Sequence, residues 1–136
     1  MLQISKKVEY GLIAILHMAL QQNSSCTTTK EISDRYSIPY NLLAKVMQVL
    51  AKNGLIFPRQ GVYGGYILTK NPLDIKISDV INAIENVPQI SLMQCEAEPI
   101  ENCAVSSYCT IKSPLLKIQQ TINNAFQKMS LQEILY

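Results

Sequence analysis

The stretch that most constrains the fold is PYNLLAKVMQVLAKNGLIFPRQGVYGGYIL, residues 39–68. Its first half predicts an amphipathic helix over about 39–53, with Pro39 at the first helical position and Gly54 as the C-cap. The apolar face of this helix consists of Leu42, Leu43, Val46, Val49 and Leu50. The second half predicts two short strands joined by a glycine-containing loop, with Pro58 on an edge strand. A helix followed by such a hairpin is typical of a winged helix-turn-helix domain.

Two further helical patterns precede this stretch. Residues 4–22 have helical period, and Thr28 with Glu31 forms a capping-box pattern that opens a helix ending near Tyr36. SIPY, residues 37–40, predicts the turn before the third helix. The apolar face of the first helix consists of Val8, Leu12, Ile15, Leu16, Ala19 and Leu20. The order helix, helix, turn, helix and hairpin predicts a winged helix-turn-helix DNA-binding domain over residues 1–72.

Residues 73–136 predict more helices around one long loop. ISDVINAIENV, residues 77–87, predicts a helix with Val80, Ile81, Ile84 and Val87 inward. Residues 88–112 have no clear period, and a loop of that length in a compact domain calls for a functional reason. A long helix is predicted from Ser113, followed by a short one capped at 130–133. The apolar side of the long helix consists of Leu115, Ile118, Ile122, Ala125, Phe126 and Met129.

The apolar stripes of the first and last long helices exceed what the core of a small domain needs. They predict a homodimer packed about a two-fold axis, whereas the alternative is that both helices only cover the core of their own chain. Helix-turn-helix proteins commonly read paired half-sites, which favours the dimer. We expect a mainly α fold with a small β-hairpin wing. Residues 73–136 would supply a ligand-binding loop and a C-terminal dimerisation helix, continuous with the first domain.

The charge distribution favours an anionic partner for the N-terminal half. Residues 1–72 hold eight Lys and Arg against three Asp and Glu, net +5, whereas residues 73–136 hold four against seven, net −3. Double-stranded DNA is the expected partner, although ordinary surface charge would give similar totals. Asn and Gln can pair with adenine, Lys can reach guanine or phosphate, and an arginine of the wing can enter a minor groove. The expected contacts are Thr28, Tyr40, Asn41, Lys45, Gln48, Lys52, Arg59 and Gln60.

Three cysteines lie in the predicted loop with the spacing C-x7-C-x5-C, at Cys95, Cys103 and Cys109. Such thiolates can hold an iron–sulfur cluster or zinc, but the paired spacing typical of structural zinc is missing and the single histidine, His17, lies in the first helix. A thiol redox switch and chance placement are the other interpretations. Cys26 lies alone in a Ser/Thr-rich loop and is expected to be incidental. The spacing leaves the fourth ligand of a metal site open.

Other classes of protein receive less support. The chain has no C-x-x-C, no nucleotide-binding glycine fingerprint and no convincing acid–base pair, so we expect neither an enzyme nor a small-molecule substrate. A partner-binding adaptor with an incidental basic half is the remaining alternative. The apolar run GLIAILHMAL is about ten residues long, too short to span a bilayer, and no cleavage site follows it. We therefore expect a cytoplasmic protein without membrane association.

Four features carry a resemblance to a known family: ISKKVEYGLIAILHMAL, TKEISDRYSIPYNLLAKVMQVLAKNGLI, GVYGGYIL and the three-cysteine loop before a long helix. Over nearly the whole chain they resemble the IscR/NsrR/RirA-type bacterial winged-helix repressors that sense iron–sulfur clusters, and most of all the regulators of SUF-type cluster assembly. The resemblance implies a homodimeric repressor whose operator affinity is controlled by a cluster, 2Fe–2S in preference to 4Fe–4S. A metal-free, thiol redox-sensing regulator is the alternative.

The resemblance also implies the cluster ligands. Cys95, Cys103 and Cys109 would bind the cluster, and the histidine ligand of IscR-like members is replaced here by Lys112, which cannot serve while charged. In NsrR-like members a carboxylate from the first helix of the other subunit completes the site, and the corresponding residue is Glu9. The alternatives are that Glu9 is a surface carboxylate beside a neighbouring lysine, and that solvent or a thiol completes the site.

Two positions of the DNA-reading elements depart from the family pattern. The residue before the wing glycine is often basic, and here it is Gln60, with Arg59 one position earlier. At the position of Ala44, IscR-like members have a glutamate that helps to select bases. These departures leave the operator sequence open.

Overall fold

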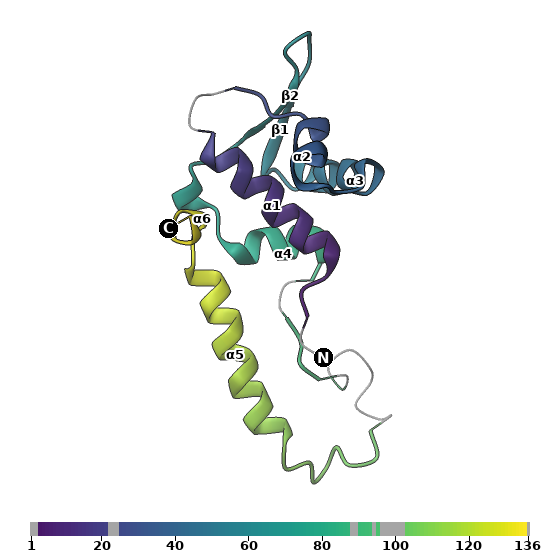
Figure 1. The fold of residues 1–136 in the computed structure, drawn as a ribbon. Coiled ribbons are helices and arrows are strands. Elements are labelled where there is room, and N and C mark those ends of the chain that lie inside the picture. The colour runs from purple at the N-terminus through teal and green to yellow at the C-terminus, as the bar shows by residue number, and fades with distance from the viewer. Residues whose placement is uncertain (1–2, 22–24, 88–89, 94, 96–102, 136) are drawn as a thin grey trace.

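The computed structural model describes residues 3–21, 25–87, 90–93, 95 and 103–135. Helices α1–α4 and a hairpin form one body, and α5 leads away from it (Figure 1). This architecture confirms the predicted fold class, mainly α with a β-hairpin wing. The elements are α1 (Lys6–Leu20), α2 (Thr29–Tyr36), α3 (Tyr40–Lys52), β1 (Ile56–Arg59), β2 (Gly65–Leu68), the 3-10 helix η1 (Pro72–Asp74), α4 (Ile77–Glu85), α5 (Lys112–Lys128) and α6 (Leu131–Ile134).

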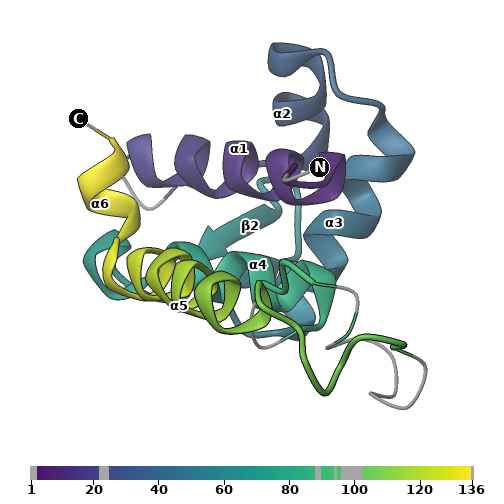
Figure 2. The same cartoon turned by 90° about the horizontal axis from the view of Figure 1, so that it is seen from below.

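Helix α1 is fixed at its start and packed along its length against α4. Ser5 caps it, since the Ser5 hydroxyl accepts a hydrogen bond from the Val8 amide at 3.3 Å and donates to the Glu85 carboxylate at the end of α4. Gly11 allows the close approach, because a β-carbon there would collide with Ile84 Cδ1. The two helices therefore run side by side (Figure 2).

The turn between α2 and α3 is set by local hydrogen bonds. Ser37 adopts the left-handed conformation with φ 54°, and the Ser33 hydroxyl donates to the Ile38 carbonyl at 2.6 Å. Pro39 is the N-cap of α3 rather than its first residue, and its carbonyl accepts from the Leu43 amide at 3.0 Å. This turn sets the angle at which α3 leaves α2.

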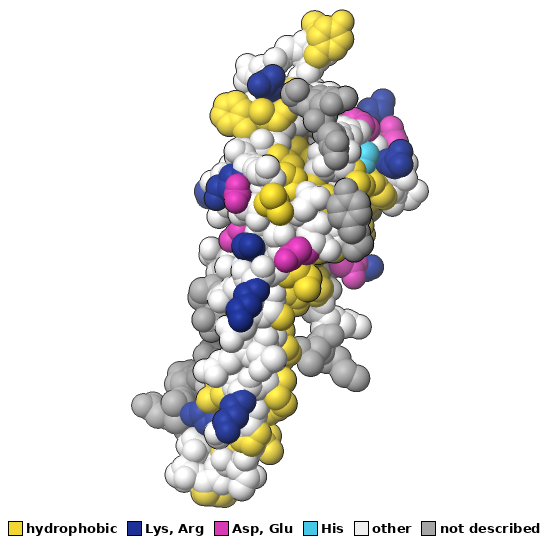
Figure 3. Space-filling view, turned by 90° about the vertical axis from the view of Figure 1, so that its left-hand side faces the viewer, with side chains coloured by type: hydrophobic (Ala, Val, Ile, Leu, Met, Phe, Trp, Pro, Cys, Tyr) yellow, Lys and Arg dark blue, Asp and Glu magenta, His cyan; other side chains and the backbone are white. Residues whose placement is uncertain are grey.

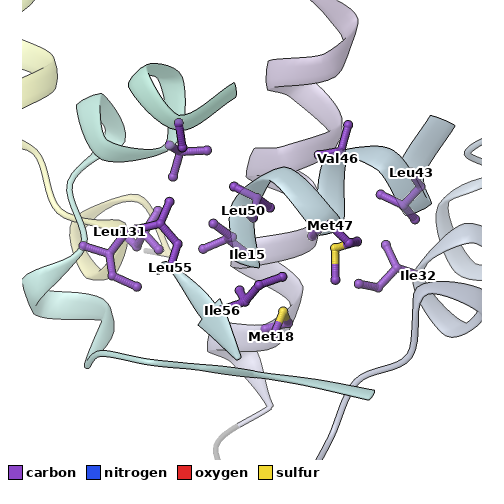
Figure 4. Packing of buried hydrophobic residues seen from close by; sticks show 14 of the residues in the cluster. Ile15, Met18, Ile32, Leu43, Val46, Met47, Leu50, Leu55, Ile56 and Leu131 are labelled. Carbon is purple, nitrogen blue, oxygen red and sulfur yellow. The ribbon is translucent and has the colours of Figure 1, made fainter. Parts of the chain in front are cut away.

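The main hydrophobic core joins both parts of the chain (Figure 4). Helix α3 contributes Leu43, Val46 and Leu50 as predicted, and also Met47, which the predicted apolar face omitted. Other members come from α1, α2 and β1, and from beyond residue 72 through Ile75, Val80, Ala83 and Leu131. The predicted domain boundary at residue 72 stays a prediction, but residues on both sides of it pack into the same hydrophobic core.

Two predicted inward residues are exposed, and several helix boundaries shift by one or two residues. Leu20, the last residue of α1, is 61% exposed. Val87 is 41% exposed because α4 ends at Glu85 and Asn86 turns the chain with φ 54°. Helix α5 begins at Lys112, one residue before the predicted start. Each error falls at a helix end, where sequence periodicity is least informative.

The wing is an antiparallel hairpin tied to the chain before α2. Strand β1 pairs with β2 in the register Ile56↔Leu68 to Arg59↔Gly65, so Pro58 lies on an edge strand as predicted. On its other side, Tyr66 of β2 exchanges two backbone hydrogen bonds with Thr27, at 2.8 and 2.9 Å. This bridge links the wing to the segment that leads into α2.

Gly65→Ala is expected to weaken the wing more than Gly61→Ala. Both glycines have positive φ, 149° and 117°, where a side chain introduces strain of about 1–3 kcal/mol. A β-carbon on Gly65 would also lie 2.7 Å from the Thr27 carbonyl oxygen, whereas one on Gly61 meets no atom within 4 Å. Urea unfolding followed by circular dichroism measures the difference; equal losses in the two variants would contradict a clash at the Thr27–Tyr66 bridge.

Helix α5 leaves its apolar stripe largely uncovered by its own chain. Ile118, Ala125 and Met129 are exposed, and Leu115, Ile122 and Phe126 are half-buried. Hydrophobic side chains are visible along this extended part of the molecule in Figure 3. Within the described ranges, no helix combines the length and apolar character needed to cross a bilayer.

Candidate nucleic-acid interface and thiol pocket

Helix α3 presents its predicted polar stripe to solvent. Asn41, Lys45, Gln48 and Lys52 are all exposed, because the opposite side of the helix packs into the core. Two amides and two cations on one face supply both kinds of contact that major-groove reading requires, to base edges and to phosphates. The stripe is thus positioned as the sequence predicts.

Thr28 and Tyr40 lie at the starts of the two reading helices. Thr28 is the exposed N-cap of α2, and its hydroxyl accepts from the Glu31 amide at 3.1 Å, so its own hydrogen remains to donate. Tyr40 opens α3 and is exposed. Both positions suit contacts to the DNA backbone.

The wing exposes both predicted contact residues and two apolar residues that were not among the predicted contacts. Arg59 ends β1 and Gln60 follows it, both exposed. At the tip, Val62 and Tyr63 are 95% and 92% exposed, the highest values among the large hydrophobic residues described. The sequence did contain a signal for this exposure: two apolar residues stand between the glycines of the predicted hairpin tip, and a hairpin tip has no core in which to bury them. Arg59 also lines a concavity shared with Lys70, beside the end of α1.

A polar network joins α1, α2 and the wing. His17 is buried, with its Nδ1 3.0 Å from the Tyr36 hydroxyl and its Nε2 3.3 Å from Glu31 Oε1. The Gln21 amide donates to Glu31 Oε1 at 2.9 Å and accepts from the Thr27 hydroxyl at 2.9 Å. Only half of the predicted capping box forms. The Glu31 amide donates to the Thr28 hydroxyl, but the Glu31 carboxylate accepts from Gln21 at the end of α1. The single histidine of the chain is a structural residue of the DNA-reading domain.

This network predicts an acid-sensitive contribution to stability. The hydrogen bond from Gln21, and then that from His17, lower the pKa of Glu31 below its ordinary value of about 4.5. A carboxyl group with a lowered folded pKa stabilises the fold above its unfolded pKa, and the contribution is lost as the pH falls through the folded pKa. Gln21→Leu is expected to reduce the loss of stability below pH of about 4.5, measured by urea unfolding from pH 7 to 3. Gln120→Leu, at an exposed site, is the control, and identical pH profiles for both variants would contradict the assignment.

The three loop cysteines line one small pocket. Cys95, Cys103 and Cys109 surround it together with Ser106 and Lys112, and all three are half-buried free thiols. Two successive turns bring the chain round between Cys103 and Cys109, with the Ser106 amide 3.3 Å from the Cys103 carbonyl and the Tyr108 amide 3.1 Å from the Val105 carbonyl. Helix α5 begins immediately beyond, and the predicted sequence cluster is also a cluster in space.

The donor set of this pocket suits an iron–sulfur cluster in kind. Soft thiolates are the usual ligands of such clusters, and three of them line the pocket. In the described part of the chain, no group of three or more His, Cys, Asp or Glu side chains is arranged to hold a single metal ion. The thiols are gathered but not drawn to one point, and the described residues that line the pocket supply three thiols and no carboxylate or imidazole as a fourth ligand.

Glu9 lies elsewhere on its own chain. Its carboxylate is 2.8 Å from Lys6 Nζ on the first turn of α1, and this hydrogen bond raises the pKa of Lys6. It lines a surface groove with residues 3–6, not the thiol pocket. The pairing matches the alternative of a surface carboxylate beside a lysine, while ligation across a dimer stays a prediction.

The helix-turn-helix, the exposed α3 stripe and the paired wing define a winged helix-turn-helix transcriptional regulator. The chain matches the model of the Rrf2 family, described as an iron-dependent transcriptional regulator, over residues 4–136. It belongs to this family, which confirms the resemblance to IscR/NsrR/RirA-type regulators and the prediction that it is not an enzyme.

Two relatives by sequence are both HTH-type transcriptional regulators named NsrR. That of Shouchella clausii is 32% identical over 114 residues, covering 84% of this chain and 75% of the relative. That of Halalkalibacterium halodurans is 28% identical over 134 residues, covering 98% and 90%. The alignments cover the DNA-reading elements and most of the remainder.

Solved structures share the fold over almost the whole chain. CymR, the global cysteine regulator of B. subtilis, superposes with a TM-score of 0.79 at 23% identity, covering 99% of this chain and 97% of the other. IscR of T. potens gives 0.77 at 26%, covering 98% and 86%. An oxidised form of Staphylococcus aureus CymR gives 0.74 at 22%, covering 98% and 96%. The winged-helix fold is therefore confirmed.

Proposed function

We propose that this protein is a homodimeric transcriptional repressor whose operator affinity is controlled by an iron–sulfur cluster held by Cys95, Cys103 and Cys109. The observation that carries the proposal is the pocket in which these three free thiols meet. The match to a family described as iron-dependent supports it. The resemblance drawn from the sequence adds the cluster type, 2Fe–2S, and target genes for cluster assembly or for iron and redox stress.

Each part of the chain has a role in this proposal. The thiolates would bind iron, and the partner subunit's Glu9 would complete the site after leaving its ion pair with Lys6. A carboxylate oxygen holds iron less tightly than a thiolate does. When bound, the cluster would supply a centre that reacts with oxygen or nitric oxide or loses iron. Because α1 carries Glu9 near its start and the His17–Gln21 network near its end, a change at the site could be passed to α2 and the wing.

The dimer is proposed from the uncovered apolar stripe of α5. Ile118→Glu, which places a charge within the stripe, is expected to shift the protein towards monomer in light-scattering or sedimentation measurements. Gln120→Glu makes the same change of charge at an exposed polar position of α5 and should leave the molar mass unchanged. A wild-type protein that is monomeric throughout would exclude this interface.

Anaerobic purification with iron and sulfide analysis and a visible spectrum tests the central claim. A brown protein with iron and acid-labile sulfide is expected. Binding to candidate operators is then measured with and without the cluster, over a series of salt concentrations, because phosphate contacts make affinity salt-dependent. Colourless protein without sulfide, even after anaerobic reconstitution, would exclude the cluster.

A metal-free thiol sensor is the second candidate. It is favoured by the gathering of three free thiols in one pocket and by the likeness in fold to a regulator solved in an oxidised form. This candidate predicts that oxidant forms a disulfide among the loop cysteines and changes the DNA affinity of metal-free protein. No change in that affinity on oxidation would remove it. The cytoplasmic location and the absence of a small-molecule substrate remain predictions.

A further inference from the structure

The buried residues of α5 are polar. Gln119 and Asn123 are 6% and 8% exposed, on a helix whose apolar side chains are half-buried or exposed. They lie four residues apart and so share one face of the helix. Buried amides carry a large energetic penalty unless their donors and acceptors are paired. Their burial therefore calls for specific partners.

Those partners are backbone groups of the segment that leads to Cys95. The Asn123 side chain accepts from the Ile90 amide at 2.9 Å and donates to the Ile90 carbonyl at 3.1 Å. Gln119 Oε1 accepts from the Leu92 amide at 2.8 Å. Two side chains of α5 thus hold alternate residues, Ile90 and Leu92, of this segment by their backbone groups. We call this pair of residues the amide clamp.

The amide clamp connects the two ends of the thiol loop. Cys95 follows Leu92 by three residues, so its α-carbon lies within about 11 Å of the clamped residue. Cys109 precedes Lys112, the first residue of α5, by three residues, and Gln119 lies seven residues along the helix, a rise of about 10 Å. Both arms of the pocket are therefore tethered to a single rigid helix.

We propose that Gln119 and Asn123 are positioning residues that set the distance of Cys95 from Cys103 and Cys109, a role that rests on the proposed cluster site. They touch no thiol in the described structure and act through the backbone at 90–92. Groups that hold metal ligands in place typically change metal affinity by about 10- to 100-fold when removed. Loss of the clamp should act mainly on the pocket, because the hydrogen bonds of Asn123 to Ile90 and of Gln119 to Leu92 lie beside the segment that leads to Cys95 and not at α2, α3 or the wing.

The chain supplies matched controls, because an exposed residue of the same type follows each clamp residue. Gln120 and Asn124 are exposed, so Gln120→Leu and Asn124→Leu repeat the chemical change of Gln119→Leu and Asn123→Leu outside the clamp. Three quantities are measured in all four variants. The first is amide hydrogen exchange at Ile90 and Leu92 in metal-free protein. The second is the affinity of reduced, metal-free protein for phenylarsine oxide, a reagent that binds two neighbouring thiols together. The third is the rate at which a chelator removes the cluster.

The clamp variants should lose exchange protection at Ile90 or Leu92, bind the arsenical more weakly and lose the cluster about 10- to 100-fold faster. The controls should match wild type in all three quantities. Unchanged protection at Ile90 and Leu92 in both clamp variants would overturn the inference, as would equal effects in clamp and control variants.

Conservative variants separate positioning from general destabilisation. Gln119→Glu keeps an acceptor for the Leu92 amide and should retain exchange protection at Leu92. Asn123→Asp keeps the acceptor for the Ile90 amide but sets a second acceptor against the Ile90 carbonyl, so it should remain impaired. Loss of Leu92 protection in Gln119→Glu as large as that in Gln119→Leu would contradict the assigned bond to the Leu92 amide. If wild-type protein takes up no cluster, the proposed function fails, while hydrogen exchange and the arsenical still decide the role of the clamp.

Discussion

Cys103→Ala protein is expected to purify without an iron–sulfur cluster and to lose the cluster-dependent part of its DNA affinity. Cys103 is one of three thiols of the pocket and is held by the turn that places the Ser106 amide against its carbonyl. Two thiolates do not replace three in binding iron, and among the described residues that line the pocket the other polar groups are the Ser106 hydroxyl and the Lys112 ammonium. Iron and sulfide analysis after anaerobic purification, with the visible spectrum, measures the loss.

Cys26→Ala is the matched control. Cys26 is also a half-buried free thiol, but it lies before α2 and does not line the pocket. This variant should keep wild-type iron, sulfide and spectrum, so that a loss in Cys103→Ala reflects the site and not the number of thiols. Full cluster content in Cys103→Ala, or equal loss in both variants, would contradict the assignment of the pocket.

On the DNA-reading side, Gln48→Ala is expected to weaken operator binding by about 1–3 kcal/mol, roughly 5- to 150-fold, and to relax base preference at one position. The reason is that Gln48 is exposed at the middle of the α3 stripe, where a paired contact to an adenine edge is possible. Lys45→Ala should weaken binding to all sequences and reduce the slope of log affinity against log salt by about 1. Titrations at several salt concentrations with cognate and substituted operators distinguish the two effects.

Lys117→Ala provides the comparison, since Lys117 is an exposed lysine on α5, away from the reading face. It should leave both the affinity and the salt slope near their wild-type values. If Lys45→Ala and Lys117→Ala have the same effect, the basic stripe of α3 is not the interface. If Gln48→Ala lowers affinity equally for every operator, Gln48 does not read a base.

Local patterns of the chain predicted most of the DNA-reading body. The spacing of apolar residues in 39–53 fixed which face of α3 is buried, and the stripe of Asn41, Lys45, Gln48 and Lys52 follows from it. Proline and glycine predicted the wing. Pro58 suits an edge strand because it has no backbone N–H to donate, and Gly65 permits the positive φ that the hairpin needs. Failures such as Val87 occurred at helix ends, where one left-handed residue, Asn86, decides the boundary.

Long-range contacts account for what the patterns missed. A single histidine gave no indication of the network that joins α1 to Glu31 and Thr27, since its partners are spread from residue 21 to residue 36. Gln119 and Asn123 read as surface residues of an amphipathic helix, and the structure buries them. Their burial depends on backbone groups at Ile90 and Leu92, which no periodicity reveals.

The residue types and their spacing were enough to identify the helices, the wing, the reading stripe and the three thiols, because each of these depends on neighbours a few positions away. The tertiary structure alone decided that the thiols line one pocket, and that α5 turns amides inward and its apolar stripe outward. These features depend on which backbone groups and side chains meet after folding, and residues far apart in the chain meet only through packing.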